Sequence, residues 1–173
     1  MSDVGIFYGS TSGNTAHVAK VIQKATGGEL HDVSSVNAEE LGNYTLLILG
    51  TSTWGAGDIQ DDWGDFLEKI RATSFENKRV ALFGLGDQFS YSDNFVDGMR
   101  DIYDVITANG GNVIGRCDDN GEYDYCESRS VVDGKFVGLP LDEDNQSNMT
   151  KTRVISWLEQ ISKECSSCCG SCG

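Results

Sequence analysis

Residues 9–15, with the sequence GSTSGNT, gather hydroxyl, amide and backbone donors in one turn that carries no charge. The turn follows the apolar residues 4–7 and precedes residues 14–26, where apolar side chains recur at helical spacing. Backbone N–H groups at the start of a helix, together with the helix dipole, favour a phosphate at such a turn. A polar turn with a Ser or Thr cap explains the segment about equally well, so this turn alone leaves both interpretations open.

The turn lacks the patterns of the commoner nucleotide-binding loops. Gly9 and Gly13 enclose three residues and Asn14 follows, whereas a Walker loop has four residues between its glycines and then a lysine. The Gly-x-Gly-x-x-Gly pattern of dinucleotide-binding folds is also missing. A phosphate bound here is therefore expected to lack a counter-cation and to take no part in a reaction.

Two further loops each carry an aromatic residue with no core to join. Residues 51–58 (TSTWGAGD) contain Trp54 between small and polar residues, and residues 84–94 (GLGDQFSYSDN) contain Tyr91. Two rings that face each other would form a slot for a flat heteroaromatic group. An isolated loop tryptophan more often packs on the surface, but the combination with Tyr91 and the first turn favours a mononucleotide. Without an adenine-binding pattern, this mononucleotide is expected to be a flavin.

The order of elements along the chain predicts an α/β fold. Strands are expected at residues 3–8, 30–33, 44–50 and 79–86, with pieces of a fifth at 112–115 and 135–139; helices are expected at 14–26, 63–70, 95–106 and 154–161. Strands that alternate with helices indicate crossover units and a parallel sheet. The three polar loops would then lie at one sheet edge, where such folds bind ligands. About twenty polar residues between 114 and 136 interrupt the fifth strand and are expected to form a small sheet lobe or an interaction surface.

Length, charge and hydropathy exclude several classes of partner. The chain has 173 residues and a net charge of -14, from 27 acidic and 13 basic side chains. This charge disfavours nucleic acids and anionic membrane surfaces and suits basic protein surfaces, although acidity that only confers solubility is the simpler interpretation. No apolar run has the length of a membrane span, and the first residues do not resemble a signal peptide, so a cytoplasmic location is expected.

Six cysteines fall into two groups. Cys117 and Cys126 lie in one polar stretch and are expected to be free thiols, because disulfides are rare in a reducing compartment. The other four crowd the final segment, residues 164–173, which is expected to be disordered. Two C-x-x-C units there could bind zinc or an iron cluster, and a lipidated tail or a redox appendage are further alternatives. A dispensable extension is the interpretation we favour.

Four segments, GSTSGNT, STWGAGDIQDDW, GLGDQFSYSDN and KFVGLPLDEDNQS, resemble flavodoxins in order and spacing, from about residue 3 to residue 163. The interruption at 116–135 is similar to the insertion of the long-chain subgroup. The resemblance implies a three-layer α/β/α sandwich with a five-stranded parallel sheet in the order 2-1-3-4-5. It places one FMN-binding domain at residues 1–163, ahead of the cysteine-rich tail at 164–173.

The resemblance also implies which residues would bind flavin mononucleotide (FMN). The phosphate would be held by Ser10, Thr11, Ser12, Gly13, Asn14 and Thr15. One side of the ring would be lined by Ser52, Thr53, Trp54, Gly55, Ala56 and Gly57, with Ser52 standing where many relatives have proline. Leu85, Gly86 and Asp87 would reach the pyrimidine edge, Tyr91 would stack on the outer face, and Asn94 and Asp144 would contact polar parts of the cofactor. No catalytic residue and no metal ligand are expected.

The implied function is a low-potential one-electron carrier that shuttles between semiquinone and hydroquinone. In this family the peptide after the tryptophan, here between Gly55 and Ala56, turns over. Its carbonyl oxygen then accepts a hydrogen bond from the protonated N5 of the flavin semiquinone. Basic-faced flavin reductases and low-potential acceptor proteins would be transient partners of a monomer, with no membrane or nucleic acid involved. An FMN-dependent NAD(P)H:quinone reductase of the same fold is the alternative. A phospho-receiver domain is set aside, because Gly9 and Thr51 occupy positions where it needs acidic residues.

Overall fold

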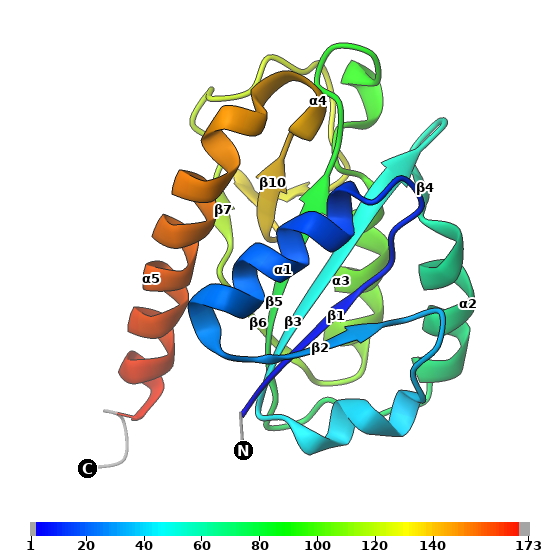
Figure 1. Ribbon diagram of the computed structural model, residues 1–173, viewed down its shortest axis with the longest axis vertical. Helices are drawn as coiled ribbons and strands as arrows, with labels where there is room; N and C mark the ends of the chain where they lie inside the picture. Colours follow the sequence, from blue (N-terminus) through cyan, green and yellow to red (C-terminus); the bar gives the residue numbers. More distant parts are fainter. Residues whose placement is uncertain (1–2, 170–173) are drawn as a thin grey trace.

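A mostly parallel seven-stranded sheet runs through the middle of the computed structural model, which describes residues 3–169 (Figure 1). Its main strands are β1 (Val4–Tyr8), β2 (Glu29–Asp32), β3 (Leu46–Trp54), β5 (Arg79–Leu85) and β10 (Leu139–Leu141). They lie in the order β10-β5-β3-β1-β2, all parallel. The expected order 2-1-3-4-5 is therefore confirmed, with β5 and β10 as its fourth and fifth strands.

The fifth position of the sheet is filled by two separate strands. β6 (Asn112–Ile114) pairs with the first half of β5, and β10 pairs with its second half. Between them the chain leaves the sheet and forms a small antiparallel sheet of β7 (Cys117–Asp118), β9 (Lys135–Phe136) and β8 (Val131–Val132). A small sheet lobe that interrupts the fifth strand was expected, and it is present.

One boundary of that interruption differs from the expectation. Residues 135–139 were expected to be a piece of the main sheet, but Lys135 and Phe136 pair within the small sheet and Leu139 begins β10. The reason is the packing of Phe136, whose buried ring joins Phe95 and two tyrosines of the insertion in one aromatic cluster.

Helices cover both faces of the sheet (Figure 1). α1 (Asn14–Thr26) and α5 (Thr150–Cys169) pack on one face, where strand residues such as Ile48 and Phe83 meet the helices. α2 (Asp61–Ile70) and α3 (Gly98–Ala108) pack on the other. The remaining elements are short: β4 (Asp58–Ile59), α4 (Glu143–Gln146) and the 3-10 helices η1 (Ala38–Asn43), η2 (Ser92–Asn94) and η3 (Ser147–Met149). None of the helices within residues 3–169 is long and apolar enough to cross a membrane.

The C-terminal helix extends further than the sequence predicts. α5 continues to Cys169, so the disorder expected from residue 164 onward is wrong for residues 164–169. Glu164 anchors the beginning of this extension, because its carboxylate accepts hydrogen bonds from the N–H of Gly115 at 2.6 Å and from Gln160 Nε2 at 3.1 Å. Residues 170–173, and the cysteine side chains beyond Cys165, lie outside the described residues, and with them the metal-binding alternatives for the tail. Cys117 and Cys126 are free thiols, as expected.

Candidate functional site

The three polar loops meet around one cavity of about 250 Å³ beyond the carboxyl ends of β1, β3 and β5. It is lined by Ser12, Asn14, Thr15, Ser52, Thr53, Trp54, Leu85, Gly86, Asp87, Tyr91, Glu143 and Asp144. All of these except Glu143 are among the residues singled out from the sequence. Folding therefore brings residues from four separate segments of the chain to one place.

The first loop leaves the start of helix α1 open toward this cavity. Gly13 takes φ 96°, a left-handed conformation that glycine adopts without strain, and makes no side-chain cap for the helix. Its N–H donates to Ser10 Oγ at 3.1 Å, which closes the loop on itself. By contrast, the side chains of Gln60 and Asp142 cap α2 and α4. Because N–H groups in the first turn of a helix have no acceptor within it, those of α1 remain for a ligand.

Gln60, which is not among the residues predicted from the sequence to bind the cofactor, packs against the first loop. Its buried side chain donates from Nε2 to Thr11 Oγ1 at 3.3 Å and accepts from the N–H of Trp63 at 3.2 Å. Trp63 in turn donates from Nε1 to the carbonyl oxygen of Gly50 at 2.7 Å. A Cβ at Gly9 would lie 2.2 Å from Gln60 Oε1, so the loop packs directly on this side chain. No local signal in the sequence marks Gln60, because Asp61 and Asp62 lie closer to the apolar helical repeat and Asp is the commoner cap residue.

The second loop is the tip of a hairpin between β3 and β4. Trp54 pairs with Asp58 across the hairpin, and the N–H of Gly57 donates to the carbonyl oxygen of Trp54 at 3.2 Å. Gly55 at the turn has φ 52°, which disfavours any residue with a Cβ. The indole Nε1 of Trp54 donates to Ser52 Oγ at 2.9 Å, so its polar edge is satisfied while the side chain stays 41% exposed.

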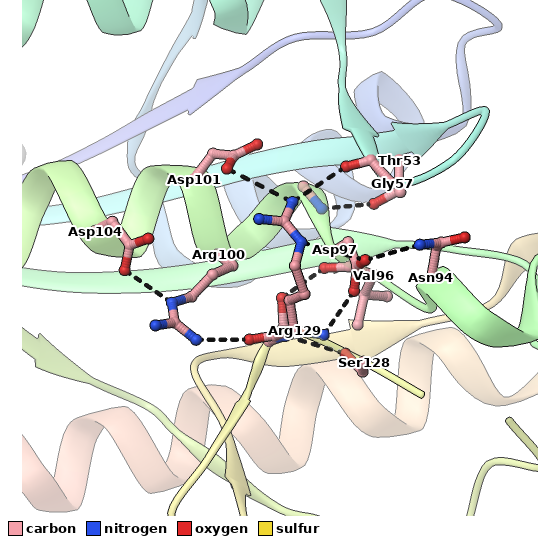
Figure 2. A network of polar contacts seen from close by, with 12 residues as sticks. Thr53, Gly57, Asn94, Val96, Asp97, Arg100, Asp101, Asp104, Ser128 and Arg129 are labelled. Atoms are coloured by element: carbon pink, nitrogen blue, oxygen red, sulfur yellow. Dashed lines mark hydrogen bonds and ion pairs between the residues drawn. The ribbon is translucent and has the colours of Figure 1, made fainter. Parts of the chain in front are cut away.

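A polar network ties this hairpin to α3 and to the insertion (Figure 2). Thr53 Oγ1 accepts from the N–H of Gly98 at 2.9 Å. Arg129 donates from Nη2 to the carbonyl oxygen of Gly57 at 3.3 Å, and its backbone N–H donates to Asp97 Oδ1 at 2.7 Å. Asp97 is fully buried, and a Cβ at Gly57 would lie 2.8 Å from its Oδ2. The position of the second loop thus depends on a side chain from the inserted segment.

The third loop is organised around the carboxylate of Asp87. It accepts hydrogen bonds from the N–H groups of Phe89 at 3.1 Å and Ser90 at 2.9 Å, and from Asn145 Nδ2 at 2.9 Å. Burial acts to raise the pKa of Asp87, but these hydrogen bonds to the charged form outweigh it, so the pKa lies below its ordinary value. The loop held in this way places Tyr91 at the cavity, with its side chain 47% exposed.

Acidic groups dominate the remaining wall of the cavity. Asp87, Glu143 and Asp144 line it, and none of the described lining residues is basic. Burial raises the pKa of Asp144, and the negative charges of Asp87 and Asp142 raise it further. Glu143 is not among the residues predicted to bind the cofactor, because it lies next to Asp144 in a run of polar residues in which nothing marks one side chain over its neighbours.

Several predicted residues lie beside the cavity instead of lining it. These are Ser10, Thr11, Gly13, Gly55, Ala56, Gly57 and Asn94. Ser10 and Thr11 are engaged within or beneath the first loop, as described above. Asn94 donates from Nδ2 to Asp97 Oδ2 at 3.3 Å, and it lines a neighbouring hollow of about 510 Å³ together with Ala56.

The cavity fits the cofactor that the sequence resemblance implies. Among the described residues, no aromatic ring contacts the ring of Trp54 or Tyr91, although both are large apolar groups that are partly exposed. Two such rings at one cavity suit the faces of a flat heteroaromatic molecule. The uncapped start of α1, with its uncharged hydroxyl and amide side chains, suits a phosphate. The cavity is somewhat smaller than pockets that enclose a whole ligand. This volume suits a ligand that keeps one edge exposed to solvent.

The chain is similar to known proteins over almost its full length. The protein-family model described as Flavodoxin matches residues 6–157. The flavodoxin of Synechocystis sp. is 42% identical over 165 residues, with 93% of this chain and 96% of that protein covered. That of Helicobacter pylori is 43% identical over 162 residues, with 93% and 97% covered. The crystal structure of Fusobacterium nucleatum flavodoxin bound to flavin mononucleotide superposes with a TM-score of 0.87 at 35% identity, covering 93% of this chain and 97% of that one.

Proposed function

This chain belongs to the flavodoxin family, and we propose that its cavity holds FMN for the transfer of single electrons between other redox proteins. The protein is an electron carrier and not an enzyme with a substrate of its own. The observation that carries the proposal is the cavity that the rings of Trp54 and Tyr91 share with the uncapped start of α1; neither ring contacts another aromatic ring within residues 3–169. FMN supplies the redox chemistry when bound, and the protein supplies binding, orientation and electrostatics.

The residues of the first loop would hold the phosphate. Ser10 and Gly13 shape the turn, while Ser12, Asn14 and Thr15 line the cavity with hydroxyl, amide and backbone donors. Such donors at a helix start stabilise an anion without a neighbouring cation. The ring would lie between Trp54 and Tyr91, whose faces exclude water from both of its sides.

The carboxylates around the cavity would lower the reduction potential of FMN bound there. A negative charge about 10 Å away from another costs about 1–2 kcal/mol at an effective dielectric of about 20. About 1.4 kcal/mol corresponds to about 59 mV for a one-electron step. Asp87, Glu143 and Asp144 together therefore disfavour the addition of an electron, and no basic side chain among the described lining residues offsets them.

The hairpin tip offers a switch in hydrogen bonding beside Trp54. Gly55 has φ 52° and no Cβ, so the peptide bond to Ala56 can turn over at little energetic cost. One orientation of this peptide would turn its N–H toward a ring bound against Trp54, and the other would turn its carbonyl oxygen toward it. In the second orientation the carbonyl oxygen would accept a hydrogen bond from a protonated ring nitrogen, which would favour uptake of the first electron.

Basic-faced reductases and low-potential acceptor proteins are the partners we propose. The net charge of -14 favours fast, salt-sensitive and transient docking of a monomer onto such surfaces. The free thiols of Cys117 and Cys126 are in keeping with a reducing compartment such as the cytoplasm. The insertion between β6 and β10 supports membership of the long-chain subgroup.

An absorption spectrum of the purified protein, followed by stepwise reduction under argon, tests the proposal. We expect a yellow protein that takes up two electrons in separate one-electron steps, the second at low potential. A colourless preparation that does not bind added FMN would overturn it. Steady-state reduction of a quinone by NAD(P)H with this protein alone would favour the reductase alternative, which the acidic cavity wall disfavours because a nicotinamide dinucleotide is also negatively charged.

A further inference from the structure

A second cavity, of about 480 Å³, lies between the insertion and helix α5. Its described lining residues do not overlap with those of the FMN site. Its apolar lining residues are Leu139, Pro140, Met149 and Trp157. Uncharged polar groups of Asn148, Thr152 and Ser156 also face it, and Arg153 lies among them. The volume is in the range of pockets that enclose small organic molecules.

Arg153 is held rigidly at this cavity. Its side chain is only 9% exposed. The guanidinium carbon lies 4.4 Å from the centroid of the Tyr123 ring, and Nη1 donates to Gln146 Oε1 at 2.8 Å. Tyr123 is itself anchored, because its hydroxyl donates to the carbonyl oxygen of Pro140. The stacking on the Tyr123 ring and the hydrogen bond from Nη1 thereby fix the orientation of the guanidinium plane.

The opposite edge of the same guanidinium has no hydrogen-bond acceptor. Nε and Nη2 of Arg153 are buried, and neither has a partner among residues 3–169. The nearest carboxylate oxygen, Glu122 Oε2, lies 3.8 Å from Nε, which is too far for a hydrogen bond, and the Glu122 side chain is 53% exposed. Buried polar groups are almost always paired, since an unpaired charged donor costs several kcal/mol. Two adjacent donors on one edge form the fork that binds a carboxylate with two parallel hydrogen bonds.

We propose that this cavity binds a small organic monocarboxylate. Its carboxylate pairs with Nε and Nη2 of Arg153 after a small displacement of the side chains that cover these two atoms, and its apolar body packs on the apolar lining residues. Charge selects a monoanion, because Asp118 and Glu122 also line the cavity and would repel a dianion such as phosphate more strongly. Planarity selects a carboxylate, because its two oxygens match the guanidinium edge. The ligand is independent of FMN and of the electron transfer proposed above.

Titration of the ¹⁵N-labelled, FMN-loaded protein with benzoate, followed at the Arg153 side-chain Nε–H resonance, tests this inference. We expect a saturable shift with benzoate and none with benzamide, which has the same shape without the charge. Arg153→Lys keeps the positive charge but loses the fork, so we expect benzoate affinity to fall about ten- to a hundredfold. The FMN absorption spectrum, recorded on the same samples, reports separately whether the flavin site is intact.

Glu122→Gln provides a second variant at an exposed position that is expected to fold. Because it removes a like charge from the cavity wall, benzoate should bind up to about fivefold more tightly. Binding to this variant but not to the unsubstituted protein would show that Glu122 itself occupies the fork, and would overturn the inference. Equal shifts with benzamide, tighter binding of inorganic phosphate, or no saturable shift in either protein would overturn it too.

Discussion

Arg129 donates a hydrogen bond from Nη2 to the carbonyl oxygen of Gly57 at 3.3 Å, and so joins the insertion to the hairpin that carries Trp54 (Figure 2). The same side chain lies 3.4 Å from the buried carboxylate of Asp97 and 3.6 Å from Asp101. An inserted segment that contacts the second loop in this way can influence the FMN site without lining it. The insertion is therefore part of the scaffold of the site as well as a surface.

Replacement of Arg129 by glutamine should weaken FMN binding. The change removes the contact to Gly57 and leaves the buried Asp97 with fewer donors, and because Arg129 is half exposed we expect a loss of about 1 kcal/mol, or about fivefold in affinity. Arg71→Gln is the matched control, since it removes the same charge from an exposed pair with Glu68 on helix α2. FMN dissociation constants from fluorescence titration provide the measurement. Equal affinities of the two variants would contradict a role of Arg129 in positioning the hairpin.

Acid should loosen the third loop through Asp87. Burial acts to raise the pKa of Asp87, but the hydrogen bonds described above hold this pKa below its ordinary value in the folded protein. A carboxyl with a lowered folded pKa stabilises the fold above its ordinary pKa, and this contribution is lost as the pH falls through the lower value. Asp87→Asn should thus lower Tm at neutral pH and converge with the unsubstituted protein in acid. Tm measured against pH for this variant and for Asp93→Asn, in the same loop, checks the prediction; parallel curves for both would contradict it.

Much of this fold could be predicted from the sequence, because its signals are local. The helical repeat of residues 14–26 coincides with α1, and the continuous apolar runs correspond to β3 and β5, whose side chains are buried on both faces of the sheet. Glycines and polar residues at the ends of these strands identified the loops of the cavity. Each of these inferences needed only neighbouring residues.

What escaped prediction depends on contacts between residues far apart in the chain. The composition of residues 164–169 suggests disorder, yet Glu164 bonds to Gly115 and the helix continues. Arg129 lies in a polar stretch without periodicity, and nothing near it in the sequence indicates that it reaches Gly57. Gln60 is not a residue type that marks a helix cap, and its contact with Thr11 is again long-range. The contacts of such side chains can be identified only once the fold is known.

The two rings at the cavity should each contribute to FMN affinity. Trp54 and Tyr91 line the cavity and are partly exposed, so their replacement would remove the proposed contact with FMN without disturbing the core. We expect Trp54→Ala and Tyr91→Ala each to raise the dissociation constant of FMN about tenfold or more. Phe89→Ala is the control, because this ring lies in the same loop as Tyr91, is 60% exposed and does not line the cavity. Should Phe89→Ala weaken binding as much as Tyr91→Ala, the third loop would act through its conformation and not through the Tyr91 ring.

Backbone freedom at Gly55 should set the spacing of the two one-electron midpoint potentials. A valine at φ 52° is strained by about 1–2 kcal/mol, and its Cβ would also lie 3.3 Å from Asp58 Oδ2, so the peptide bond to Ala56 can no longer turn over freely. About 1.4 kcal/mol corresponds to about 59 mV, so Gly55→Val should lower the first midpoint potential by several tens of millivolts. The two midpoint potentials should then lie closer together or change their order. Gly42→Val is the control, because a Cβ there would meet no atom within 4 Å. Spectroelectrochemical titration of both variants measures the effect, and unchanged potentials in Gly55→Val would exclude the peptide as the switch.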